Sequence, residues 1–221
     1  TLSPSSAASD VYKRQLQLLS SYQVEGIVVN AVGMREEVLS HLQQSLLPMV
    51  LIDRKIPDFP CDVVGLNNAE AAETATRHLV DNGYEALLFL SEPLGSVNTR
   101  RERLQAFRQV LAGAPQVEHE NAELALHQPA ALDQALRTFH QRHAGKRSAV
   151  MVANGALTLQ VARSLQRINL HWGRDIGLLG FDELEWAALA GVGITTLKQP
   201  TWQIGYSALE RVIARIESSD L

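Results

Sequence analysis

Short runs of apolar residues alternate along this chain with segments in which apolar residues recur at helical spacing. Most of the runs are continuous and rich in Val, Ile and Leu, which is typical of parallel strands buried on both faces. Strands are predicted at 26–30, 49–53, 63–66, 86–91, 149–153 and 176–181, and helices at 35–44, 69–81, 99–112, 130–142, 156–167 and 202–216. This alternation predicts an α/β fold with a doubly wound parallel sheet and helices on both of its faces.

Two glycines mark predicted helix ends. Gly83 and Gly113 each follow a helical segment directly, where a left-handed residue commonly closes the helix. The segment 114–129 contains scattered Pro, His and Glu, and we expect a surface connection there with one short edge element.

Composition narrows the class of protein. The 221 residues are 46% hydrophobic and 20% charged, without a long apolar run, so the chain can bury one large core or two smaller ones and is neither disordered nor membrane-spanning. The net charge of −4 argues against a surface built to neutralise nucleic-acid phosphates. One cysteine, Cys61, and no recognisable secretory signal fit a reducing compartment, so we expect a cytoplasmic protein.

The first fifteen residues do not fit the rest of the chain. Residues 1–15 have no apolar period and look like translated adapter sequence, so they are predicted to be a non-native leader. A natural flexible leader is the alternative.

Two residues that could contact a ligand follow the last predicted strand, 176–181. Asp182 follows this strand directly and Trp186 follows four residues later, at the edge where open α/β sheets place their ligand crevice. An acid that accepts hydroxyl hydrogen bonds and an aromatic face that contacts ring carbons are typical of a sugar site. Alternatively, Asp182 caps a helical segment at 184–190 and Trp186 packs under the loop.

The predicted helix 99–112 places cations near its buried face. Its apolar residues are Leu104, Phe107, Val110 and Leu111, and helical projection puts Arg100 and Arg103 on or beside them. A buried charge is costly unless it is paired, and a ligand with hydroxyls or a carboxylate would pair it. Alternatively, the arginines of this helix form a solvated face with snorkelling stems.

Two motifs carry a family resemblance. The sequences GFDE at 180–183 and TTLKQP at 195–200, with further matches from about Leu16 onward, resemble the effector-binding domain of the lactose-repressor/galactose-repressor (LacI/GalR) family of bacterial regulators. The resemblance implies two parallel-sheet lobes of the type I periplasmic-binding-protein kind, with the ligand between them. One lobe would comprise 16–66 and 201–221 and the other 67–193, with a hinge crossing at 194–200. The domain would be incomplete at its N-terminus, with the helix-turn-helix, hinge helix and first βα unit absent before Leu16.

The resemblance also implies ligand contacts. Arg103, four residues before Phe107, matches the family's effector-binding arginine, and Thr99 lies one turn earlier. Asp53, in the family's strand-end Asp-Arg pair, and Asn154, at another strand end, match residues that line the site. Asp53 bonding the next loop and Asn154 capping the helix after it are the structural alternatives. Gly155 replaces the family's usual Asp, which alters the local hydrogen bonding.

These features predict the sensing domain of a DNA-binding transcriptional regulator that binds a small sugar or sugar acid. The sequence FDELEW at 181–186, together with TTLKQP, most resembles the branch of the family that senses sugar acids. Lys198 and Arg103, with Arg54 as a further candidate, would suit such an anionic ligand. Operator DNA would be bound by a helix-turn-helix outside this chain, and a homodimer or tetramer is expected. The alternative is a periplasmic sugar-binding protein of a transporter, which shares the two-lobed architecture.

Other chemistries find little support in the sequence. His140 and His143 lack a carboxylate or cysteine at ligand spacing, so no metal site is expected. The chain contains no nucleophile elbow, Walker loop or dinucleotide fingerprint, so we expect no cofactor. Asp53 and Asp182 could be imagined as a glycosidase pair, but a binding protein needs strand-end acceptors too, and no catalytic residue is predicted.

Overall fold

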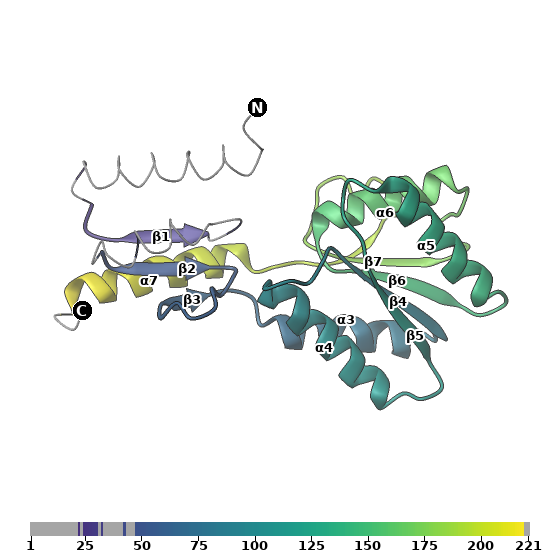
Figure 1. The fold of residues 1–221 in the computed structure, drawn as a ribbon, viewed down its shortest axis with the longest axis horizontal. Helices are drawn as coiled ribbons and strands as arrows, with labels where there is room; N and C mark the ends of the chain where they lie inside the picture. The colour runs from purple at the N-terminus through teal and green to yellow at the C-terminus, as the bar shows by residue number, and fades with distance from the viewer. Residues whose placement is uncertain (1–21, 23, 31, 33–41, 43–46, 219–221) are drawn as a thin grey trace. The chain divides into compact units, whose positions relative to one another are not determined.

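The computed structural model describes residues 22, 24–30, 32, 42 and 47–218 (Figure 1). The chain divides into two compact units, unit 1 with Thr1–Leu66 and Pro200–Leu221, and unit 2 with Asn67–Gln199. Each unit contains its own parallel sheet, as the family resemblance implies. The predicted leader at 1–15 and, apart from Leu42, the predicted helix at 35–44 lie outside the described residues.

Unit 2 is a five-stranded parallel sheet covered on both faces. Its strands are β4 (Ala86–Ser91), β5 (Glu118–Glu123), β6 (Ser148–Val152), β7 (Gly177–Phe181) and β8 (Thr195–Leu197), in the order β5-β4-β6-β7-β8. The helices α3 (Asn68–Asp81) and α4 (Asn98–Ala112) cover one face, and α5 (Pro129–Arg142) and α6 (Gly155–Arg167) cover the other (Figure 1). This is one doubly wound α/β layer structure.

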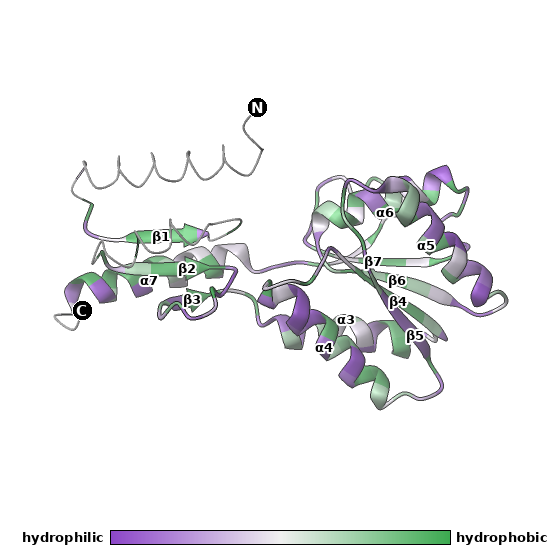
Figure 2. Cartoon of the chain, in the orientation of Figure 1, coloured by the Kyte–Doolittle hydropathy of each residue, from purple (hydrophilic) through white to green (hydrophobic). Residues whose placement is uncertain are grey.

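The central strands of unit 2 are apolar on both faces because each face meets helices. Leu88 and Leu90 of β4 pack with Phe139 of α5 in one core, while Phe89 points to the other face. There its ring lies 5.4 Å from the ring of Phe107 on α4, centroid to centroid. Figure 2 shows these strands in green and the outer strand β5 mostly in purple.

Unit 1 contains a three-stranded parallel sheet, β1-β2-β3. The strands are β1 (Ile27–Asn30), β2 (Met49–Ile52) and β3 (Asp62–Val64), and the helix α7 (Thr201–Glu217) returns from the end of the chain. Ala208 and Val212 of α7 pack on Val50 of β2, so one face of the sheet is covered by a segment about 150 residues further along the chain.

The structure corrects one local prediction and confirms another. Gly83 has a left-handed φ of 75°, as predicted, but Gly113 has φ −86° because the chain continues from α4 into a right-handed turn. The segment 114–129 contains the six-residue strand β5 at the edge of the sheet, which confirms the edge element expected there. Among the described helices, none has the length and hydropathy needed to cross a bilayer.

Replacing Gly180 with alanine is expected to destabilise the protein by about 1–3 kcal/mol. A Cβ at Gly180 would lie 2.6 Å from Oγ1 of Thr158, which is buried and donates a hydrogen bond to the carbonyl of Asn154. The control is Gly205→Ala in α7, where a Cβ has open space and the loss of backbone freedom in the unfolded chain should stabilise by about 0.5–1 kcal/mol. Urea denaturation measures both; equal effects would contradict the packing argument.

Acid should weaken unit 1 through Asp62. Its carboxylate accepts hydrogen bonds from Nε of Arg215 (2.8 Å) and Nε of Arg211 (2.6 Å), and these bonds, the one from Arg215 most strongly, lower the pKa of Asp62 well below its usual range. A depressed pKa stabilises the fold above the unfolded-state pKa of about 4, and this contribution is lost as the pH falls further. Because both arginines are about half exposed, we expect Asp62→Asn to cost under about 1 kcal/mol at pH 7. Urea denaturation of the wild type and Asp62→Asn at pH 7 and pH 2 measures this stability difference. If the difference at pH 2 is as large as at pH 7, the ion pair is not its source.

Candidate functional site

The carboxyl ends of β4, β6 and β7 lie at one edge of the unit 2 sheet because the strands are parallel. Polar side chains lie just beyond each of these strands: Glu92 and Asp182 follow β4 and β7 directly, and Asn154 follows β6 after one residue. Ligands of open α/β sheets bind beyond this edge. The structure therefore brings predicted site residues from separate parts of the chain to one place.

Asp182 is held by groups from two neighbouring segments. Its carboxylate accepts a hydrogen bond from the amide N–H of Gly155 (3.0 Å) and another from the side-chain amide of Gln199. The backbone of Asp182 is left-handed, with φ 72°, an uncommon conformation that Asp tolerates better than most residues. The alternative that Asp182 caps a helix is wrong, since 184–190 forms turns and a bend.

Gly155 makes this arrangement possible. A Cβ at this position would lie 3.2 Å from Oδ2 of Asp182 and 3.1 Å from Leu184, so a side chain here would crowd the carboxylate. The departure from the family's usual Asp thus has a visible consequence: Asp182 reaches the first N–H of α6, where the helix dipole favours an anion.

Asn154 is both a helix cap and part of a side-chain network. Its Oδ1 accepts from the N–H of Leu157 (2.9 Å), which confirms the capping alternative. Its Nδ2 donates to Oε2 of Glu92 (2.8 Å), and Nη2 of Arg100 lies 2.7 Å from the same oxygen in an ion pair. Asn154 is therefore fixed at the edge by both ends of its amide.

Arg103 is a buried cation with specific partners. Only 4% of the residue is exposed; Nε donates to Oδ1 of Asn68 (2.8 Å), and Nη1 donates to the carbonyl of Ala153. The guanidinium carbon lies 4.0 Å from the centroid of the Phe181 ring, within range of a cation–π interaction. The solvated-face alternative is wrong for Arg103.

The other polar residues of α4 differ in exposure. Thr99 is buried, one turn before Arg103. Arg100 is mostly covered, whereas Arg101 and Arg108 are exposed. The solvated-face alternative is therefore correct for Arg101 and Arg108 only. Inward projection therefore correctly separated the two kinds of arginine on this helix.

Trp186 and Lys198 have structural partners in unit 2. Trp186 lies in the turns after β7 and packs, partly buried, against the core under α5 and α6, so the packing alternative holds for it. Lys198 forms an exposed ion pair with Glu183. A ligand would meet Lys198 only in competition with that carboxylate.

Asp53 belongs to unit 1 and directly follows β2. Its φ is 70°, so the two predicted strand-end acids share a left-handed backbone. Its N–H donates to the carbonyl of Val64 (3.0 Å), and Oδ2 lies 3.4 Å from Nε of Arg54. Such strained conformations persist where surrounding contacts impose them, and they are frequent at binding sites.

Sequence reasoning missed several residues at this edge. Glu92, Asn68 and Phe181 all contact predicted site residues, and Gln199 was assigned only to the hinge crossing. Glu92 follows β4 directly, so the strand-end rule applied to Asp53 and Asp182 could have identified it. Asn68 lies in the first turn of α3 and carries no comparable sequence signal.

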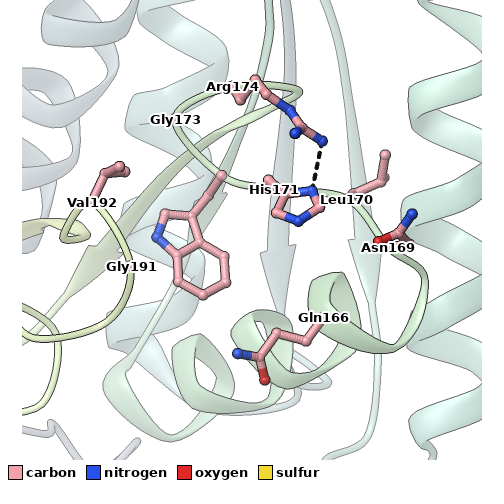
Figure 3. Close-up of a pocket in the computed structure, with 9 residues that line it drawn as sticks. Gln166, Asn169, Leu170, His171, Gly173, Arg174, Gly191 and Val192 are labelled. Atoms are coloured by element: carbon pink, nitrogen blue, oxygen red, sulfur yellow. Dashed lines mark hydrogen bonds between the residues drawn. The ribbon is translucent and has the colours of Figure 1, made fainter.

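A cavity of about 480 Å³ lies at the opposite edge of the same sheet (Figure 3). Its lining comes from the segments leading into β7 and β8, among them Leu170, His171, Arg174 and Val192. The ring of His171 and the guanidinium of Arg174 both contact the carboxylate of Asp175. Because this edge carries strand beginnings, the cavity does not coincide with the predicted ligand site.

The described residues contain no group of three or more His, Cys, Asp or Glu side chains that could hold a metal ion. His143 lies between two glutamates of β5, with Nδ1 2.9 Å from Glu118 and Nε2 3.1 Å from Glu120. The nearby Lys146 also pairs with Glu118. This is an ion-pair cluster at the outer edge of unit 2.

Comparison with known proteins gives a consistent result. Residues 76–220 match the family model described as periplasmic binding protein-like domain. The chain is 38% identical over 204 residues to the HTH-type transcriptional regulator PtxS of Pseudomonas putida, a match that covers 92% of this chain and 59% of that protein. The chain thus spans about three fifths of the length of this curated relative.

Solved structures agree on the fold. A probable maltose operon transcriptional repressor from Staphylococcus aureus matches with a TM-score of 0.83 at 17% identity, covering 96% of this chain and 76% of that one. A LacI family transcriptional regulator from Enterococcus faecium with bound ribose matches with a TM-score of 0.74 at 16% identity, covering 94% and 76%.

Proposed function

This chain belongs to the family of periplasmic binding protein-like domains, in the form that LacI/GalR regulators carry, and we propose that it senses a small sugar or sugar acid for such a regulator. The observation that carries the proposal is the convergence of Arg103, Asn154 and Asp182 at the carboxyl edge of the unit 2 sheet.

The chemistry of this edge suits a polyhydroxylated ligand. Carboxylate and amide oxygens accept hydrogen bonds from hydroxyls, and arginine donates to hydroxyl or carboxylate oxygens. Arg103, Thr99, Asn154 and Asp182 are the ligand residues we propose in unit 2, and Asp53 is the one we propose in unit 1. Trp186 lies on the same loop as Asp182, four residues further along the chain, and would position that loop by packing against the core. The structural neighbour with bound ribose supports a sugar as the ligand class.

The regulator's response would depend on parts outside this chain. Ligand binding would favour one arrangement of the sensing domain, with residues 194–200 as a hinge crossing, and so alter operator binding by a helix-turn-helix elsewhere in the protein. A homodimer or tetramer in the cytoplasm would match a palindromic operator. The HTH-type relative supports this role over transport in the periplasm and over catalysis.

Thermal unfolding with added ligands tests the proposal. Ribose, glucose, galactose, gluconate and galacturonate are each added at millimolar concentration, and binding at 100 times Kd should stabilise by about 2.7 kcal/mol and raise the Tm. A neutral polymer of similar viscosity serves as the control for nonspecific effects. If none of these ligands shifts the Tm beyond the control, the proposed ligand class is wrong.

A further inference from the structure

Glu92 is not among the ligand residues proposed above, although it contacts one of them, Asn154. The residue follows β4 directly and is mostly covered, with 19% of its side chain exposed. Its neighbours come from the two adjacent elements: Arg100 from the first turn of α4 and Asn154 from the end of β6. Glu92 therefore connects a cation to a residue proposed to contact ligand.

The contacts of Glu92 leave one of its oxygens unengaged. Nδ2 of Asn154 donates to Oε2 (2.8 Å), and Nη2 of Arg100 forms an ion pair with the same oxygen at 2.7 Å. In the part of the chain that the structure describes, no group donates to Oε1. A carboxylate with a free acceptor favours a hydroxyl next to it and disfavours another carboxylate.

Arg100 is neutralised by this arrangement. Its side chain is only 14% exposed, and its Nη1 also donates to the carbonyl of Pro93 (2.7 Å). The mostly covered pair is poorly screened by solvent, so the charge of Glu92 changes how strongly Arg100 attracts a second anion. A ligand carboxylate near Arg100 must therefore compete with Glu92.

We propose that Glu92 and Arg100 form a balanced charge pair that sets the preference of the site between acidic and neutral sugars. The proposal rests on the function proposed above and names the residues that decide the ligand's charge class. With both residues present the pair carries no net charge, and specificity comes from hydroxyl contacts. Removing one partner leaves a charge that selects for or against a ligand carboxylate.

The test compares two ligands that differ at one carbon. Gluconate and glucitol share the same open chain, with a carboxylate replaced by a hydroxymethyl group in glucitol. Isothermal titration measures both affinities for the wild type, Glu92→Gln, Arg100→Gln and the double variant. Glu123→Gln is the matched control, because Glu123 ends the next strand but accepts from the N–H of Leu94. Circular dichroism melting confirms that each variant is folded.

The expected results have opposite signs. Glu92→Gln should raise the ratio of gluconate to glucitol affinity roughly tenfold, and Arg100→Gln should lower it by a similar factor, a size typical of close, mostly covered charges. The double variant should return to the wild-type ratio, and Glu123→Gln should not change it. If glucitol binding is too weak to measure, the gluconate affinity alone must be highest in Glu92→Gln, intermediate in the wild type and lowest in Arg100→Gln.

Two outcomes overturn the inference in distinguishable ways. If the wild type binds either ligand and the ratio is the same in Glu92→Gln, or falls equally in both single variants, then the charge pair does not select the ligand. If the wild type binds neither ligand, nor any member of the thermal-unfolding panel, the proposed sugar-sensing function fails as well.

Discussion

Replacing Arg103 with alanine is expected to abolish ligand binding and to lower the free energy of unfolding by about 2–4 kcal/mol. The substitution removes the hydrogen bonds that Arg103 donates to Asn68 and to the carbonyl of Ala153. It also removes the packing of the guanidinium over the Phe181 ring and leaves a cavity in its place. Urea denaturation measures the stability, and titration with the best ligand of the thermal panel measures the binding.

Two further variants separate a folding defect from a binding defect. Arg108→Ala removes an exposed arginine of the same helix that donates to Asn121, and it should cost under about 1 kcal/mol without affecting binding. Arg103→Lys keeps the positive charge but loses the planar guanidinium with its fixed donors. We therefore expect the variant to remain folded and to bind the ligand more than about tenfold more weakly. Wild-type affinity in a folded Arg103→Lys variant would remove the guanidinium from the ligand site.

Asp182→Asn is expected to weaken ligand binding roughly 100-fold while the protein stays folded. The carboxylate accepts from Gly155 and from Gln199, and an amide of the same shape turns one acceptor into a donor. Asn tolerates the left-handed φ of 72°, so the backbone should not change, and the stability loss should be about 1–2 kcal/mol.

The matched control for this variant is Glu183→Gln, the neighbouring acid whose partner is the exposed Lys198. Neutralising an exposed ion pair should change neither stability nor binding appreciably. If Glu183→Gln weakens binding as much as Asp182→Asn, a general negative charge on this loop is responsible, and the specific acceptor role of Asp182 is wrong.

The elements that periodicity predicted well are those buried on both faces. The strands β4, β6 and β7 are continuous apolar runs. Because such a strand has no polar face, it must lie inside the sheet, with helices covering both of its faces. The strand β5 reads EHENAE and has no such signal, because it pairs with a neighbour on one side only. Its formation depends on backbone pairing with β4, which the sequence pattern does not encode.

The site was predictable only as far as the strand-end rule extends. That rule placed Asp182 and Asn154 at one edge, and helical projection turned Arg103 inward. The left-handed backbones of the two strand-end acids and the bond from Gly155 to Asp182 depend on tertiary packing, so the sequence alone could not reveal them. Trp186 had two equally good explanations, and the structure shows that its ring packs, partly buried, against the core.

Amide NMR titration tests most directly where the ligand binds. The 221-residue chain is labelled with ¹⁵N and titrated with whichever sugar or sugar acid raises its Tm. We predict that the largest chemical-shift changes occur at the backbone amides of Gly155, Leu157 and Asp182. The side-chain Nε–H of Arg103 should change as strongly. Changes confined to the cavity lined by His171, Arg174 and Val192, with Gly155 and Asp182 unaffected, would contradict the account and place the ligand at the opposite edge of the sheet.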